Sequence, residues 1–478
     1  MLFNSITFAF FLPIVFVLYW FVFQRNLKYQ NFFVVCASCV FYGWWDWRFL
    51  SLIFISTFQD YFVALKLKQT IDERKRKKWL LVSVLVNIGF LGFFKYFNFF
   101  IDNFVSALTF IGLNPNVTSL NIILPVGISF YTFQTLSYTI DVYKKKIEPT
   151  TDFMAFAAYV SFFPLLVAGP IERATQLLKQ FYVKRTFDYA KAADGMRQIL
   201  WGLFKKIVIA DNCATYVNII FENSHDQTGS TLLLGAVFFA FQIYGDFSGY
   251  SDIAIGTARL FGINAMRNFA YPYFSRDIAE FWRRWHISLS TWFRDYVYIP
   301  LGGSRVTKPK VIRNTFIIFL VSGFWHGADW TFIVWGAFHA VLFLQLILVE
   351  KNRINTDSVA EGKLFPNVKE IFQMGTTFLM VVVGWIFFKA DSIGQALDYL
   401  VGIVNVNFFS KPLNYGGMNK TAFFVSIMLI AEWFQRNRAH ALQIASLHVC
   451  LRRIIYVLII LCIVFFMGKN EQFIYFQF

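Results

Sequence analysis

The segment Lys66–Phe100, KLKQTIDERKRKKWLLVSVLVNIGFLGFFKYFNFF, decides the fold of this chain. Its first part, Lys66–Lys78, holds seven Lys or Arg residues, and its second part, Trp79–Phe100, is an apolar run. A helix needs roughly 20 mostly apolar residues to cross a bilayer, and basic loops collect on the cytoplasmic side. The segment therefore predicts a cytoplasmic loop followed by a membrane helix.

Similar apolar runs recur along all 478 residues, of which 57% are hydrophobic and only 15% are charged. Soluble domains carry about 25% charged residues. Two irregular runs, Phe153–Gly169 and Val311–Trp325, are typical of broken or re-entrant segments. We predict an all-α, polytopic transmembrane helical bundle that forms a single domain over residues 1–478. The other expected spans are Ile6–Phe23, Asn31–Trp45, Phe49–Leu65, Asn121–Ile140, Met196–Phe221, Thr231–Phe247, Trp330–Leu348, Ile371–Phe388, Thr421–Trp433 and Ile454–Met467.

The net charge of +16 comes from basic residues that stand between the apolar spans. This arrangement is typical of loops that face anionic lipid, so nucleic acid is not an expected partner. Placing Lys66–Lys78, Lys144–Lys146 and Arg259–Arg313 in the cytoplasm leaves both termini outside the membrane.

The five cysteines lie mostly in apolar runs and are expected to be small buried hydrophobes. Cys36 and Cys39 form a C-x-x-C pair, but the pair lies inside a span and has no second ligand pair. The histidines and carboxylates also lack metal-binding spacing. We therefore expect no metal site and no bound cofactor.

Two of the six histidines stand in unusual surroundings. His326 follows an apolar run and is flanked by Gly323 and Gly327. An ionisable group at membrane depth is costly and marks function by default. A histidine can take a proton from a hydroxyl and return one to a leaving group near neutral pH. His326 is thus a candidate catalytic residue, with a packing role as the alternative. The second histidine, His286, lies in a basic aromatic segment.

The segment around His286 is expected to be one amphipathic helix, Phe281–Arg294. Trp282 and Trp285 would share its apolar face, whereas Arg283 and Arg284 would point away from it. Such a helix could anchor the chain at the membrane surface. It could instead hold a phosphate-bearing donor, because Arg makes bidentate contacts with phosphate.

Two carboxylates, Asp246 and Asp252, stand six residues apart in the polar segment YGDFSGYSD beside an apolar span. They could orient His286, pair with an Arg, or bind ions as in a transporter. The spacing alone leaves these alternatives open.

Several motifs between Gly202 and Ala340 together resemble the membrane-bound O-acyltransferase family, in the branch of the bacterial alginate O-acetyltransferase membrane subunit. Two upstream segments, Leu124–Gln134 and Phe163–Arg173, resemble the same branch. The main motifs are GLFKKIVIAD (202–211), YGDFSGYSD (244–252), YPYFSRD (271–277), FWRRWHISLSTW (281–292), YIPLGGS (298–304) and GFWHGA (323–328).

This resemblance implies a helical bundle around a central catalytic tunnel, with a catalytic core at about residues 120–345. It implies that His326 is the main catalytic residue and His286 the second functional histidine. Acetyl-CoA is the implied cytoplasmic donor. An extracytoplasmic acetyltransferase-like partner protein would complete transfer to a cell-surface polysaccharide acceptor, an alginate-like exopolysaccharide or peptidoglycan. The expected location is the bacterial inner membrane.

The C-terminal tail, residues 468–478, is expected outside the membrane and contains the aromatic segment FIYFQF. It resembles the tail of the small membrane partner in teichoic-acid D-alanylation systems. The resemblance implies that Tyr475 is a candidate acyl relay. Tyr is also common at membrane interfaces, so the tail could be a simple anchor.

Two other functions remain open from the sequence. A transporter or flippase would use Asp246, Asp252 and the Arg residues as a substrate path without covalent chemistry. However, the chain lacks repeated halves with matching broken spans. A sensor or scaffold without activity is the third possibility.

Overall fold

The computed structural model is helical and contains no strand in the residues it describes, 1–113, 115, 120–167, 169–413, 415–469 and 471–476. Among these described residues, five helical stretches are long and apolar enough to cross a membrane: Leu27–Gln69, Glu73–Phe110, Gly229–Leu260, Trp330–Leu348 and Val368–Lys389. The prediction of an all-α, multi-pass membrane protein is confirmed. The chain forms two compact units: an N-terminal unit of Met1–Ala192 with Thr257–Ala265, and a C-terminal unit of Ala193–Gly256 with Met266–Phe478.

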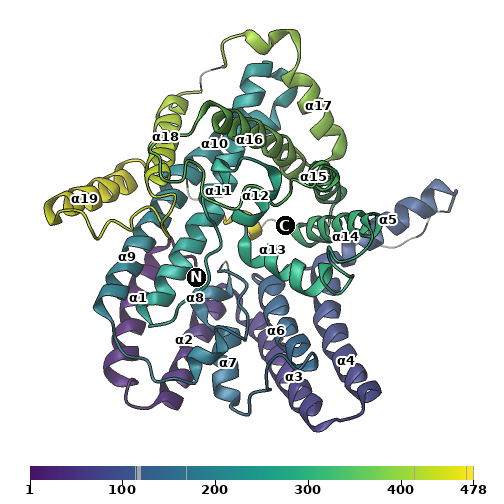
Figure 1. Cartoon of the computed structure of the whole chain (residues 1–478), viewed down its shortest axis with the longest axis vertical. Coiled ribbons are helices and arrows are strands. Elements are labelled where there is room, and N and C mark those ends of the chain that lie inside the picture. Colours follow the sequence, from purple (N-terminus) through teal and green to yellow (C-terminus); the bar gives the residue numbers. More distant parts are fainter. Residues whose placement is uncertain (114, 116–119, 168, 414, 470, 477–478) are drawn as a thin grey trace. The chain divides into compact units, whose positions relative to one another are not determined.

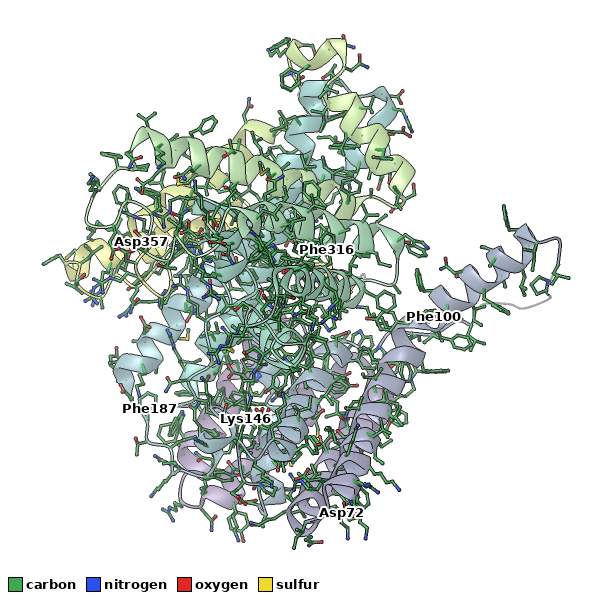
Figure 2. All side chains as sticks on the ribbon, turned by 45° about the vertical axis from the view of Figure 1, so that its right-hand side comes forward. Asp72, Phe100, Lys146, Phe187, Phe316 and Asp357 are labelled. Atoms are coloured by element: carbon green, nitrogen blue, oxygen red, sulfur yellow. The ribbon has the colours of Figure 1, made fainter. Side chains whose placement is uncertain are left out.

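Long helices dominate the N-terminal unit, and three of them, α3, α4 and α6, pack side by side (Figure 1). Asp72, labelled in Figure 2, begins α4 by accepting a hydrogen bond from the backbone N–H of Arg74. The predicted span Trp79–Phe100 is distributed over α4 and α5, which are joined by the π-helical turn Gly92–Tyr96. The helices of this unit are α1 (Ile6–Val17), α2 (Leu27–Asp46), α3 (Leu50–Gln69), α4 (Glu73–Leu91), α5 (Phe97–Phe110), α6 (Ile128–Tyr143), α7 (Phe153–Ser161) and α8 (Phe163–Leu166).

A buried polar cluster joins α3, α4 and α6. The carboxylate of Asp60 is fully buried and accepts hydrogen bonds from Ser83 Oγ at 2.6 Å and Asn87 Nδ2 at 2.8 Å. Thr135 on α6 donates to Asn87 Oδ1 at 3.3 Å. Hydrogen bonds between membrane helices hold them together where no water is available. This cluster therefore fixes how the three helices of the N-terminal unit pack.

The C-terminal unit begins within α9 and contains the remaining helices, except for the end of α11 from Thr257 to Leu260, which belongs to the N-terminal unit. The irregular run Phe153–Gly169 of the other unit is broken into α7 and α8, as expected, but Val311–Trp325 lies within one continuous helix that ends at His326. The helices are α9 (Tyr189–Leu203), α10 (Asp211–Glu222), α11 (Gly229–Leu260), α12 (Ile278–Arg284), α13 (Ile287–Phe293), α14 (Lys308–His326), α15 (Trp330–Leu348), α16 (Val368–Lys389), α17 (Ile393–Ile403), α18 (Met418–Phe434) and α19 (Val449–Phe465).

Helix α11 is longer than the predicted span Thr231–Phe247, because it continues to Leu260. The prediction ended the span where the charged residues begin. In the structure, Asp246 and Asp252 stay in the helix because two buried lysines of the π-helical segment Phe204–Ala210 neutralise them. Buried charges are tolerated where they are paired.

Helices α14 and α15 form a tight hairpin (Figure 1). A Cβ atom on Gly323 would collide with the carbonyl oxygen of Phe332, and one on Gly336 with that of Phe319. Small residues let two helix backbones approach closely in a membrane protein. This close packing fixes the end of α14, where His326 lies.

Candidate active site

His326 is the last residue of α14 and is 2% exposed. The chain leaves the helix at Gly327, where a Cβ atom would overlap the ring of Phe332. Asp329 then caps α15 by accepting a hydrogen bond from the backbone N–H of Thr331 at 2.8 Å. The hairpin thereby holds the His326 imidazole in a fixed, buried position. The aromatic rings of Trp325, Trp335 and Phe388 surround it.

His286 breaks the segment that was expected to be one helix. The prediction of a continuous helix Phe281–Arg294 is wrong, because α12 ends at Arg284 and α13 begins at Ile287. His286 itself has φ of 43°, in the left-handed region that non-glycine residues seldom adopt. Such an unusual backbone conformation often marks a functional position.

Asn268 sets the orientation of His286. Its Oδ1 lies 3.0 Å from His286 Nδ1 and accepts a hydrogen bond from Ser288 Oγ at 2.9 Å. Its backbone carbonyl accepts from the N–H of Ile287, and its Nδ2 donates to Ser251 Oγ at 3.0 Å. An amide oxygen only accepts, so Nδ1 carries the proton of the neutral imidazole and Nε2 is the basic nitrogen.

The C-terminal tail brings Tyr475 to the two histidines. The ring centroid of Tyr475 lies 5.7 Å from that of His326 and 6.4 Å from that of His286, and the two imidazole centroids are 6.5 Å apart. Phe247 of α11 packs on both Tyr475 and His286, at 4.4 Å and 4.7 Å between centroids. The Tyr475 hydroxyl is buried and has no hydrogen-bond partner within the described part of the chain.

Polar contacts tie this tail to the core of the C-terminal unit. The backbone N–H of Ile474 donates to Asp246 Oδ2 at 2.7 Å, and Lys206 Nζ donates to the carbonyl oxygen of Glu471 at 3.0 Å. Phe473 and Ile474 are buried. The tail therefore packs inside the unit.

The predicted supporting carboxylates pair with lysines. Asp246 Oδ1 lies 2.8 Å from Lys206 Nζ, and Lys206 also pairs with Asp211 at 2.8 Å. Asp252 pairs with Lys205 at 2.7 Å. Both lysines are almost fully buried. These lysines were not among the predicted site residues, although two adjacent charged residues in an apolar run indicate a function at membrane depth, as His326 does.

The four residues predicted to bind the donor lie in or just after α12. Arg284 Nη2 lies 2.7 Å from Glu280 Oε1, and Arg283 donates to the backbone carbonyls of Asn352 and Asn355. Trp285 is buried against Trp385, and Trp282 packs on Trp335. Arg283 is exposed and Arg284 is partly exposed.

The described residues hold no group of three or more His, Cys, Asp or Glu side chains arranged for a metal ion. Acid–base chemistry by imidazole and phenol is what the cluster of His286, His326 and Tyr475 can perform. Helices of membrane-crossing length and two neighbouring buried imidazoles define the class of this chain as a membrane protein with a buried histidine pair.

The chain belongs to the membrane-bound O-acyltransferase family, whose model matches residues 41–385. It is therefore a multi-pass membrane acyltransferase. The probable alginate O-acetylase AlgI of Pseudomonas syringae pv. tomato is 41% identical over 398 residues, which are 83% of this chain and 74% of that protein. The peptidoglycan O-acetyltransferase of Helicobacter pylori is 36% identical over 436 residues, 85% of this chain and 80% of that protein.

A more distant relative is named for a different activity. The teichoic acid D-alanyltransferase of Bacillus subtilis is 30% identical over 245 residues, 48% of this chain and 61% of that protein.

Proposed function

We propose that this enzyme moves an acetyl group from cytoplasmic acetyl-CoA toward a hydroxyl of a cell-surface polysaccharide, an alginate-like exopolysaccharide or peptidoglycan. An extracytoplasmic acetyltransferase-like protein completes the transfer. The relatives named as a probable alginate O-acetylase and a peptidoglycan O-acetyltransferase support the acetyl group and the polysaccharide acceptor. The observation that carries the proposal is the close approach of Tyr475, whose hydroxyl is buried, to the buried His286 and His326.

The first step forms an acetyl ester on Tyr475. His326 takes the proton from the Tyr475 hydroxyl, and the phenolate oxygen attacks the carbonyl carbon of the thioester. The carbon–sulfur bond breaks, and the thiolate of CoA receives the proton from His326. A phenol has an ordinary pKa near 10, so it needs a base such as imidazole to become a nucleophile at neutral pH.

The second step moves the acetyl group to an acceptor hydroxyl. The hydroxyl loses its proton to an imidazole and attacks the acetyl carbon on Tyr475. The Tyr475 oxygen leaves and is reprotonated by the same imidazole. A phenol is a better leaving group than a sugar alcohol, so the aryl ester lies above the sugar ester in energy. The second transfer therefore runs downhill.

A direct route is the alternative within the same site. His326 would then take the proton from the acceptor hydroxyl itself, and Tyr475 would serve to pack the tail. Both routes use His326 as the base, but only the relay needs the Tyr475 hydroxyl.

The donor and partner complete the proposal. Arg283 and Arg284 supply positive charge for the phosphates of CoA. Arg283 is held in place by backbone carbonyls and Arg284 by Glu280. Lys205–Asp252 and Lys206–Asp246 support the site by holding α11 and the tail. The exported partner receives the acetyl group outside the membrane.

Acetyl transfer by purified protein tests this function against transport without chemistry. With labelled acetyl-CoA, we expect the enzyme to release free CoA and to label an acceptor, whereas a transporter leaves the thioester intact. His326→Ala should lower the rate about 10²–10⁴-fold, the usual contribution of an acid–base group. Near-normal transfer by a well-folded His326→Ala protein would contradict the assigned base.

A further inference from the structure

The N-terminal unit contains an open pocket of about 400 Å³, and none of the residues assigned to the proposed reaction lines it. Its wall is the segment between η4 (Leu178–Phe181) and α9 together with the end of α11, at Arg259–Gly262. Phe187, labelled in Figure 2, lies on this wall. Both wall segments belong to basic stretches of the sequence, and the Arg259 segment is predicted to lie in the cytoplasm.

The pocket is strongly positive. Five of its lining side chains are cationic and a single one, Asp188, is anionic. Asp188 Oδ1 caps α9 by accepting hydrogen bonds from the backbone N–H groups of Ala190 and Lys191. Its other oxygen lies 3.9 Å from Lys191 Nζ. Asp188 therefore already has backbone N–H groups and Lys191 as its partners, and this one carboxylate is outnumbered by the cations of the pocket. The cations are Lys179, Lys184, Arg185, Lys191 and Arg259.

Arg185 is the buried cation of this pocket, with 5% of its surface exposed. Its guanidinium donates to Gln30 Oε1 and to Asn31 Oδ1, which are neutral amide oxygens. It also lies over the rings of Tyr19 and Phe181. Its Nη1 has no hydrogen-bond partner within the described residues, and no carboxylate pairs with it there. A buried charge without a counter-ion is costly, so the site is built for an anion.

Hydrogen bonds fix the pocket wall in place. Trp20 Nε1 donates to the carbonyl oxygen of Leu260 at 2.9 Å, and the Tyr19 hydroxyl donates to that of Phe261 at 2.9 Å. Gln180 and Asn264 exchange two further hydrogen bonds. These contacts hold the end of α11 beside Arg185, so the cations are positioned before any ligand arrives.

We propose that this pocket binds the phosphate of an anionic ligand. Guanidinium and ammonium groups are the side chains that hold phosphate, and the buried Arg185 supplies the fixed charge. The exposed Val183 and Phe187 give the pocket an apolar rim. Two sources carry this chemistry on the cytoplasmic side: the headgroup of an anionic phospholipid and the phosphates of CoA. The CoA source rests on the proposed function.

The test compares two charge-matched double variants of the full chain in detergent. Lys179→Gln with Lys184→Gln removes two exposed cations of the pocket. Lys75→Gln with Lys77→Gln removes two exposed cations from the basic start of α4 and is the control. Neither pair makes an ion pair in the described residues, so both variants should fold. Native mass spectrometry measures retention of phosphatidylglycerol against phosphatidylcholine, and equilibrium binding measures CoA against dephospho-CoA.

We expect the pocket variant to lose about tenfold or more in affinity for one of the phosphate ligands, because it can no longer make the charge-assisted hydrogen bonds of two lysines to phosphate. The control should bind like the wild type. Selective loss of phosphatidylglycerol identifies a lipid site, and selective loss of CoA identifies a nucleotide site. If the pocket variant binds phosphatidylglycerol and CoA as tightly as the wild type does, the proposal is wrong. Because no acetyl transfer is measured, this outcome is separate from failure of the proposed function.

Discussion

The carboxylate of Asp246 holds the backbone of Ile474, the residue before Tyr475. Its Oδ2 accepts the Ile474 N–H at 2.7 Å, while its Oδ1 lies 2.8 Å from Lys206 Nζ. The next residue of α11, Phe247, packs on the Tyr475 ring. One short segment of α11 therefore fixes both the backbone and the ring of the tail beside the histidines.

Asp246→Asn should loosen this tail. The asparagine amide has the same shape as the carboxylate, but it is neutral and pairs poorly with Lys206. One carboxylate oxygen is also replaced by an NH₂ group, a donor that faces another donor at either the Ile474 N–H or Lys206. We expect faster amide hydrogen exchange at Ile474 and a fall in acetyl transfer of about tenfold or more. The rate of exchange across residues 471–476 is the measurement.

Asp252→Asn is the matched control on the same helix. Asp252 pairs with Lys205 and accepts a hydrogen bond from Gln198, and among the described residues no hydrogen bond or ion pair joins it to the tail. Its variant should keep wild-type exchange at Ile474. If Asp246→Asn leaves the tail as protected as in the wild type, the positioning role of Asp246 is wrong.

Asn268→Ala should misorient His286 without moving the tail. The variant removes the oxygen that lies 3.0 Å from His286 Nδ1, so the imidazole loses its fixed tautomer. A lost or unsatisfied hydrogen bond of this kind costs about 1–3 kcal/mol, which corresponds to about 5-fold to 160-fold in rate. We expect slower acetyl transfer, an altered pH–rate profile, and unchanged exchange at Ile474. An unaltered rate and profile would show that Asn268 does not position a functional histidine.

Gly323→Ala should destabilise the hairpin that holds His326. The new methyl group would collide with the carbonyl oxygen of Phe332, and overpacking of this kind costs about 1–3 kcal/mol. Gly375→Ala in α16 is the control, because no atom lies within 4 Å of its added Cβ. Thermal unfolding in detergent should show a lower midpoint for the first variant alone. Equal midpoints would mean that the hairpin tolerates the methyl group.

The sequence predicted the membrane class well, because apolar runs of span length carry that signal directly. It predicted the helix boundaries less well where tertiary contacts override the local sequence pattern. Phe281–Arg294 has helical periodicity, yet Asn268 binds the chain at Ile287 and Ser288 and the helix breaks at His286. The end of α11 was missed because its carboxylates were judged without their lysine partners.

The residues of the candidate site could be predicted from the sequence, but their proximity in space could not. His286 and His326 stood out by their flanking residues, and Tyr475 by its resemblance to another tail. Their proximity depends on the tight α14–α15 hairpin and on the contacts of Asp246 with the tail. These contacts join segments far apart in the chain, so no local pattern in one sequence reveals them. Asn268 also lacked any local signal.

The relay through Tyr475 is tested most directly by the rate of polymer acetylation in the Tyr475→Phe variant. The change keeps the ring, with its packing on Phe247 and the histidines, and removes only the buried hydroxyl. Loss of a catalytic nucleophile should lower the rate by at least about 10²-fold while the tail stays protected from hydrogen exchange. Acetylation at the wild-type rate by this variant would contradict the relay and leave direct transfer at His326 as the route.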